Sequence, residues 1–300
     1  MTNIPPFFWM LLLAGGMLGN HSNAIARTYP FEVEISGNGP DMILIPGHSC
    51  DGSVWDETVA HYQARFRCHV LTLAGYAGLA PTGADGKLLI QYQEGILQYI
   101  ETLPSPKVTL VGHSIGGFLG MKLALKAPQK IERLLLIDAL PFLPAAQNPD
   151  ARPEDTNMDV AAMVSMRKTM GRTQYDAFQR QTLAGMIRTT SRIDTVLEWS
   201  WRTDPFTAFQ TMAELMQEDL RPELASLQTP TLVIGAFGWE EGAIPGFTLE
   251  RTQAIYKGQY AEHPALELYI CEAARHFIMY DDFDCMIDHM DQFLDTVHGQ

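Results

Sequence analysis

Short apolar runs alternate with longer segments of helical period along most of the chain. Parallel strands need crossover connections of about a dozen residues or more, so this alternation predicts a mostly parallel sheet with helices on both faces, an α/β fold. The runs that we interpret as strands are 41–46, 68–73, 107–111, 131–137, 231–234 and 266–270. The segments that we interpret as helices are 57–66, 88–103, 115–127, 248–260 and 283–297.

One interval breaks the alternation. Roughly ninety residues separate the strand that ends near Asp138 from the strand that begins at Thr231, far more than a crossover requires. Within it, residues 142–222 are rich in methionine and aromatic side chains. We predict that they form a helical cap over a site, because flexible methionines suit apolar ligands of variable shape. The alternative is that most of these side chains form the core of the cap itself.

The N-terminal segment has the features of a signal peptide. Residues 1–26 contain no Lys, Arg, Asp or Glu, their apolar run 7–18 is short for a membrane span, and Ala24 and Ala26 suit a signal peptidase. We therefore predict a signal peptide over 1–26 and export to the periplasm or the medium. Because no Lys or Arg precedes the run, an N-terminal membrane anchor is the alternative. The remaining chain divides into core 27–141, cap 142–222 and core 223–300.

Charge and cysteine content exclude several classes of protein. The formal net charge of -14 argues against a nucleic-acid partner, because such a partner requires a concentrated positive field. The four cysteines are too few to be the disulfide scaffold of a domain of this size, and they allow three complete pairings. No two of them have the close spacing of a zinc site, so we expect no metal.

The motif Gly112-His113-Ser114-Ile115-Gly116-Gly117 follows an apolar strand and precedes a helix. In a tight strand-to-helix turn, small residues must flank the central serine, and the N-terminus of the next helix faces developing negative charge. These demands indicate that Ser114 is a catalytic nucleophile. The alternative is a serine that only caps the helix.

The motif resembles the nucleophile elbow of the α/β-hydrolase superfamily. Residues 45–55, Ile-Pro-Gly-His-Ser-Cys-Asp-Gly-Ser-Val-Trp, are similar to the loop after the third strand in that family. The resemblance covers nearly all of the expected mature chain and implies a helical cap inserted after the sixth strand. It also implies that the backbone N–H groups of His48 and Ile115 form an oxyanion hole, so that the His48 imidazole need not react.

The resemblance assigns the general base to His276. The family places its base in the loop after the last strand, here residues 273–282. The other late histidines are His263, His289 and His298, which lie outside this loop.

The acid that orients the base has three possible origins. Gly238 stands where the family usually has Asp, after the penultimate strand. Glu240 or Glu241 of the same loop could be the acid instead. Asp138, at the end of the preceding strand, is the second possibility, because some members of the superfamily carry their acid there. The third is that neither loop supplies the acid. We favour Asp138, because open α/β sheets assemble their sites at the carboxyl ends of strands.

These residues imply hydrolysis of a carboxylic ester, or a related acyl substrate, through an acyl-enzyme and without a cofactor. The expected substrate is a small, partly apolar molecule. Lactonase, thioesterase and carbon–carbon hydrolase activities are alternatives, as is a non-catalytic binding protein on the same scaffold.

Overall fold

The computed structural model describes residues 29–83, 86–238 and 248–296. The predicted signal peptide 1–26 and the candidate acids Glu240 and Glu241 lie outside these residues. Among the helices that are described, none has the length and apolar character needed to cross a membrane.

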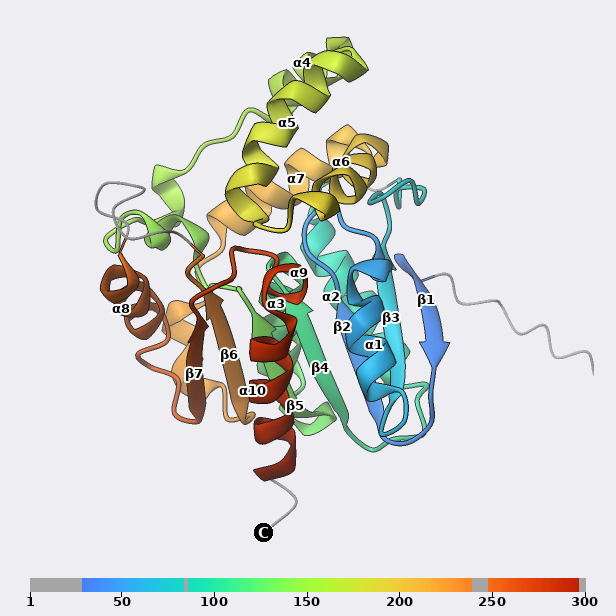
Figure 1. Ribbon diagram of the computed structural model, residues 1–300, viewed down its shortest axis with the longest axis vertical. Helices are drawn as coiled ribbons and strands as arrows, with labels where there is room; N and C mark the ends of the chain where they lie inside the picture. The colour runs from blue at the N-terminus through green and yellow to red at the C-terminus, as the bar shows by residue number, and fades with distance from the viewer. Residues whose placement is uncertain (1–28, 84–85, 239–247, 297–300) are drawn as a thin grey trace, which may run out of the picture.

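The core is a seven-stranded sheet with the strand order β1-β3-β2-β4-β5-β6-β7 (Figure 1). Strand β1 runs antiparallel to β3, and every other neighbouring pair is parallel. This confirms the predicted mostly parallel sheet. The strands are β1 (Phe31–Ser36), β2 (Asp41–Ile45), β3 (Arg67–Leu73), β4 (Val108–His113), β5 (Ile131–Ile137), β6 (Thr231–Ala236) and β7 (Leu266–Cys271).

Strand β1 is absent from our sequence interpretation, which sought buried apolar runs. Its sequence FEVEIS alternates apolar and charged or polar residues, because β1 is an edge strand and most of its residues are partly or fully exposed. The strand numbers taken from the family also need correction. The described sheet has one strand fewer ahead of both features, so the loop that contains His48 follows β2 and the inserted segment follows β5.

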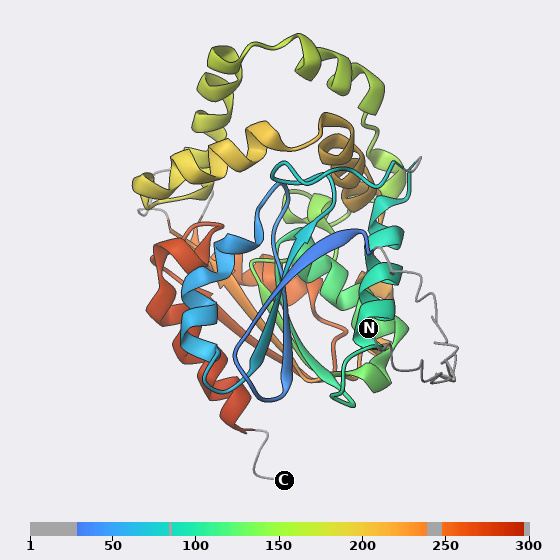
Figure 2. The same cartoon turned by 90° about the vertical axis from the view of Figure 1, so that its right-hand side faces the viewer.

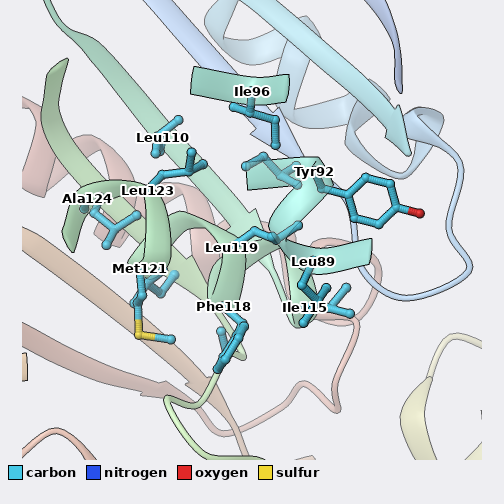
Figure 3. Packing of buried hydrophobic residues seen from close by; sticks show 14 of the residues in the cluster. Leu89, Tyr92, Ile96, Leu110, Ile115, Phe118, Leu119, Met121, Leu123 and Ala124 are labelled. Carbon is cyan, nitrogen blue, oxygen red and sulfur yellow. The ribbon is translucent and has the colours of Figure 1, made fainter. Parts of the chain in front are cut away.

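Helices cover both faces of the sheet and enclose two apolar clusters. Alternate residues of one strand divide between them: Ile43 and Ile45 belong to one cluster, and Met42 and Leu44 to the other. The first cluster packs β4 against α2 (Leu88–Ile100) and α3 (Ile115–Lys126), as Figure 3 shows. Residues of α8 (Leu249–Gln259) also belong to the first cluster, and the second contains residues of α1 (Asp56–Tyr62) and α10 (Phe283–Thr296).

The inserted segment 142–222 is helical, and its helices lie at one end of the sheet (Figures 1 and 2). Asp159 and Asp204 cap two of the helices, because each carboxylate accepts a backbone N–H of the first turn. The main helices are α4 (Val160–Thr169), α5 (Arg172–Met186), α6 (Ile193–Arg202) and α7 (Pro205–Gln217). A short helix, α9 (Ile278–Asp281), follows β7 in the core.

A buried ionic network joins the starts of β2 and β3. The fully buried carboxylate of Asp41 accepts hydrogen bonds from Arg67 Nε at 2.6 Å and from His69 Nε2 at 2.8 Å. Burial alone would raise the pKa of Asp41, but hydrogen bonds from Arg67, Ser105 and His69 outweigh it and lower the pKa from 3.8 to about 2. The ionised carboxylate is therefore a stabilising element of the folded state.

Candidate active site

Ser114 occupies the turn between β4 and α3 with φ 54° and ψ -121°. A positive φ is unfavourable for a side chain with a Cβ, and such strain persists only where surrounding structure enforces it. Here the Ser114 N–H donates to the Ile137 carbonyl at 3.0 Å, which fixes the turn against β5. The turn thus has the strand–serine–helix geometry that the motif predicts.

The glycines of the motif are required by close backbone approaches. A Cβ at Gly112 would lie 2.4 Å from the Gly116 carbonyl oxygen, and a Cβ at Gly116 would lie 2.3 Å from the Ile45 carbonyl oxygen. Both obstacles are backbone atoms, which cannot rotate aside as a flexible side chain can. The spacing of the motif therefore follows from the packing of the turn against α3 and β2.

The structure brings His276 and Asp138 together. His276 lies in the loop after β7, and its Nδ1 is 2.5 Å from Asp138 Oδ2. An ionised carboxylate only accepts hydrogen bonds, so Nδ1 carries the proton and Nε2 keeps a lone pair. The side chain of His276 is 23% exposed and that of Asp138 13% exposed, so the imidazole is accessible while the carboxylate is mostly covered.

The other oxygen of Asp138 is also held. Oδ1 accepts the backbone N–H of Ala236 at 3.0 Å and the hydroxyl of Tyr256, a residue of α8 that the sequence analysis did not identify. Burial, and then the neighbouring Asp138 charge, raise the pKa of Tyr256 well above 10, so its hydroxyl remains a donor. The sequence of α8 contains no motif that would indicate this contact.

Position 238 has no room for an acid. A Cβ at Gly238 would lie 2.5 Å from the carbonyl carbon of Ala274, in the loop that carries His276. The carboxylate that contacts His276 therefore comes from Asp138, at the end of the adjacent strand β5.

The two predicted oxyanion-hole amides belong to His48, in the loop after β2, and to Ile115, which directly follows Ser114. Ile115 is the first residue of α3, so no carbonyl within the helix can accept its N–H. For the backbone N–H of His48, no acceptor is present within residues 29–83, 86–238 and 248–296. Both amides are thus available to a ligand.

The imidazoles of His48 and His113 have structural partners. His48 Nε2 donates to the Ala208 carbonyl of α7 at 2.8 Å, and burial lowers the pKa of His48. His113 Nε2 donates to the His276 carbonyl at 2.9 Å. Burial and the nearby His276 lower the pKa of His113 well below 6.5. Both rings are therefore neutral, and His113 helps to position the loop of His276.

A cavity of about 550 Å³ contains Ser114 and His276 in its wall. Residues from the inserted segment complete it, including Met158, Met186 and Phe209. In the part of the chain that the structure describes, the Ser114 hydroxyl has no hydrogen-bond partner. Catalytic hydrogen bonds are often long in the absence of substrate. A mainly apolar cavity of this size can hold a small organic ligand.

A disulfide fixes the segment that contains His276. It joins Cys271, at the end of β7, to Cys285 in α10, while Cys50 and Cys68 are buried thiols. The two bonded sulfurs and Asp282 form the one cluster with metal-ligand geometry among the described residues. Disulfide sulfurs are not thiolates, so this cluster does not offer the ligands that a zinc site needs.

Comparisons with known proteins identify the family of the chain. The model of the alpha/beta hydrolase family matches residues 42–293. A pimeloyl-[acyl-carrier protein] methyl ester esterase of Nitrosomonas europaea is 26% identical over 231 residues, which cover 71% of this chain and 86% of the esterase. The enzyme of the same name from Aeromonas salmonicida is 27% identical over 272 residues, covering 88% and 96% of the two chains.

A solved structure supports the same fold. The enol-lactonase of Burkholderia xenovorans LB400 aligns with a TM-score of 0.70 at 20% identity, over 88% of this chain and 96% of the lactonase. With most of its length matched by the family model, the chain belongs to the alpha/beta hydrolase family.

Proposed function

We propose that this hydrolase cleaves a carboxylic ester or a related acyl substrate, with Ser114 as nucleophile, His276 as general base and Asp138 as the acid that orients the base. The observation that carries the proposal is the 2.5 Å contact between His276 Nδ1 and Asp138 Oδ2, beside a cavity that also contains Ser114. A base held in this tautomer can accept a proton only at Nε2.

The first half of the reaction forms an acyl-enzyme. Ser114 Oγ attacks the substrate carbonyl carbon while its proton moves to His276 Nε2, and Asp138 stabilises the resulting imidazolium. The backbone N–H groups of His48 and Ile115 donate hydrogen bonds to the oxyanion. The tetrahedral intermediate then breaks its bond to the leaving oxygen, which takes the proton from His276 Nε2 and departs as the alcohol.

The second half repeats these steps with water. Nε2 of His276 removes a proton from a water molecule whose oxygen attacks the acyl carbon. The same two amides hold the second oxyanion. The bond to Ser114 Oγ breaks, the serine recovers its proton from His276, and the carboxylic acid leaves. No redox change occurs at any step, so the cycle requires no cofactor.

The substrate class that we propose is a small, partly apolar acyl ester covered by the inserted helices, which act as a cap. Apolar side chains, with Met158, Met163, Met186 and Met212 among them, make up most of the part of the cavity wall that the insertion contributes. The relatives whose name specifies methyl ester hydrolysis make methyl esters of medium-chain acids the first substrates to test.

We also propose that the chain is exported by its N-terminal segment. A structural disulfide, Cys271–Cys285, favours an oxidising compartment. Cell fractionation and N-terminal sequencing test this: we expect mature protein that begins at Arg27 outside the cytoplasm, and an intact N-terminus in the membrane fraction would indicate an anchor instead.

Hydrolysis of a panel of methyl, aryl and alkyl esters, lactones and thioesters, with fluorophosphonate labelling in parallel, tests the catalytic proposal. We expect Ser114→Ala to abolish labelling, and Ser114→Ala and His276→Ala each to lower kcat by roughly a thousand-fold or more, because nucleophile and base act as a unit. A folded variant of either type that keeps most of the wild-type turnover would refute the assignment.

A further inference from the structure

Arg167 of α4 lines the same cavity as Ser114 and His276. Its guanidinium carbon lies 4.1 Å from the ring centroid of Tyr175 and 4.2 Å from that of Trp201. The two rings meet edge to face, with centroids 5.3 Å apart and planes at 61°. Arg167 is thus held in an aromatic corner, where cation–π attraction restricts its side chain before any ligand arrives.

The charge of Arg167 is not balanced by a carboxylate within the described residues. One of its five N–H donors is used, because Nη2 donates to the Trp201 carbonyl at 3.2 Å. Most other arginines of the inserted segment form ion pairs with acidic side chains; these are Arg152, Arg172, Arg180, Arg192, Arg202 and Arg221. Arg167 therefore combines a fixed position, unused donors and an uncompensated charge.

The polar side chains around the aromatic corner are uncharged and do not neutralise the charge of Arg167. The Tyr175 and Ser200 hydroxyls hydrogen-bond to each other, and Gln179 Nε2 donates to the Tyr175 hydroxyl at 3.3 Å. All three residues line the cavity, and none is anionic. They provide polar surface next to Arg167 in a cavity that is otherwise mainly apolar.

We propose that Arg167 binds a carboxylate at the end of the substrate remote from the scissile ester, so that half-esters of dicarboxylic acids are the preferred substrates. This inference rests on the function proposed above, which places ester cleavage at Ser114. An apolar chain between the two ends would contact the methionine side chains of the cavity.

A carboxylate fits this position better than a neutral group. Guanidinium and carboxylate are both planar, and two parallel N–H···O bonds join them edge to edge. A cation in an apolar cavity is costly without a counter-ion, and a substrate monoanion would balance it with one opposite charge. A neutral end group would leave the charge of Arg167 unbalanced.

The decisive comparison uses two substrates of equal length. One is a monomethyl ester of a linear dicarboxylic acid, and the other is the same methyl ester with a terminal carboxamide instead of the carboxylate. The series spans chains of four to ten carbons, a span on the order of what a cavity of this class accommodates. The proteins are the wild type, Arg167→Met, Arg167→Lys and the control Lys168→Met, which removes an exposed charge from the adjacent position of α4.

The measured quantity is the ratio of kcat/KM for the carboxylate ester to kcat/KM for the carboxamide ester. We expect a ratio well above one in the wild type and in Lys168→Met, and a fall of about 10- to 100-fold in Arg167→Met, the usual effect of removing one partner of a charge-assisted hydrogen bond. Arg167→Lys should recover part of the ratio, because it keeps the charge without the planar edge.

Two results would overturn the inference without affecting the proposed function: a wild-type ratio near one, or equal losses for both substrates in Arg167→Met. Calorimetric binding of the carboxylate ester to Ser114→Ala and to Ser114→Ala/Arg167→Met decides the role of Arg167 independently of turnover. A Kd that rises at least about ten-fold in the double variant supports the inference. An unchanged Kd refutes it even if the esters are hydrolysed.

Discussion

Replacing Asp138 by Asn is the most direct test of the acid, because the change keeps the shape of the side chain and removes its charge. Asp138 accepts hydrogen bonds on both oxygens: His276 Nδ1–H on Oδ2, and Ala236 N–H with the Tyr256 hydroxyl on Oδ1. An asparagine has one acceptor oxygen and one NH₂ group. Its orientation is decided by which of these donors the oxygen retains.

The structure indicates the orientation and the size of the effect. If the amide oxygen faces Ala236 and Tyr256, two donors are satisfied and the NH₂ group faces His276 Nδ1. His276 must then accept at Nδ1 and carry its proton on Nε2, the tautomer that cannot take the proton of Ser114. The same substitution logic in serine proteases costs about ten-thousand-fold in turnover. We expect a loss of at least about 100-fold in kcat, or roughly 2.7 kcal/mol.

The assay compares Asp138→Asn with Glu240→Gln and Glu241→Gln near pH 8, where an ordinary histidine is mostly neutral. Thermal unfolding of each variant checks that the fold is retained. We expect much smaller effects for the two glutamine variants. A folded Asp138→Asn enzyme with near-normal turnover, beside a crippled glutamine variant, would move the acid to the loop after β6 and refute our reasoning.

Three further predictions concern stability. Gly116→Ala should destabilise the protein by roughly 3 kcal/mol or more in chemical denaturation, because its Cβ would lie 2.3 Å from a backbone oxygen. The control Gly185→Ala in α5, where nothing lies within 4 Å of the added Cβ, should be neutral or stabilising. Equal effects of the two substitutions would contradict the close approach at Gly116. Cys271→Ser/Cys285→Ser should lose about 2–4 kcal/mol and also turnover, since the bridged segment contains His276, and full activity would limit the disulfide to stability. Because the pKa of Asp41 falls from 3.8 to about 2 on folding, the stabilisation by its carboxylate is complete above about pH 4 and is lost as the pH falls toward 2. The Tm difference between wild type and Asp41→Asn should therefore shrink over that range. A constant Tm difference would refute the assignment.

The sheet and its main helices follow from the sequence, because buried parallel strands are continuous apolar runs that periodicity detects. Helix α3 begins at Ile115, as the motif requires, α8 ends within a residue of its predicted limit, and α10 begins at Phe283 as predicted. Strand β1 was not predicted, because an edge strand with exposed residues has no continuous apolar run. For α4–α7, the sequence shows only that a helical segment interrupts the alternation of strands and helices. Where these helices lie cannot be predicted, since helix–helix packing depends on contacts distant in sequence.

Some residues of the candidate site could likewise be predicted from the sequence, and others could not. Ser114 could be identified from its motif between a strand and a helix, and His276 from the loop in which the resemblance to the hydrolase superfamily places the base. The partners of Asp138 could not be identified, since Tyr256 approaches from a helix that carries no motif. The sequence gives no sign of the place of Arg167, which is followed by another cation, Lys168, in α4. Only the cavity shows that Arg167 and Ser114 line the same wall.

Two glycines, one in β6 and one just after it, show why the carboxylate that contacts His276 follows β5. A Cβ at Gly235 would lie 2.7 Å from the ring of Tyr256, so glycine there lets the tyrosine reach Asp138. A Cβ at Gly238 would lie 2.5 Å from Ala274, so glycine there lets the loop of His276 pack against β6. An aspartate at 238 would push away the loop that carries His276, the residue that it would have to contact. The glycine at 238 is therefore a steric requirement of the arrangement in which Asp138 contacts His276.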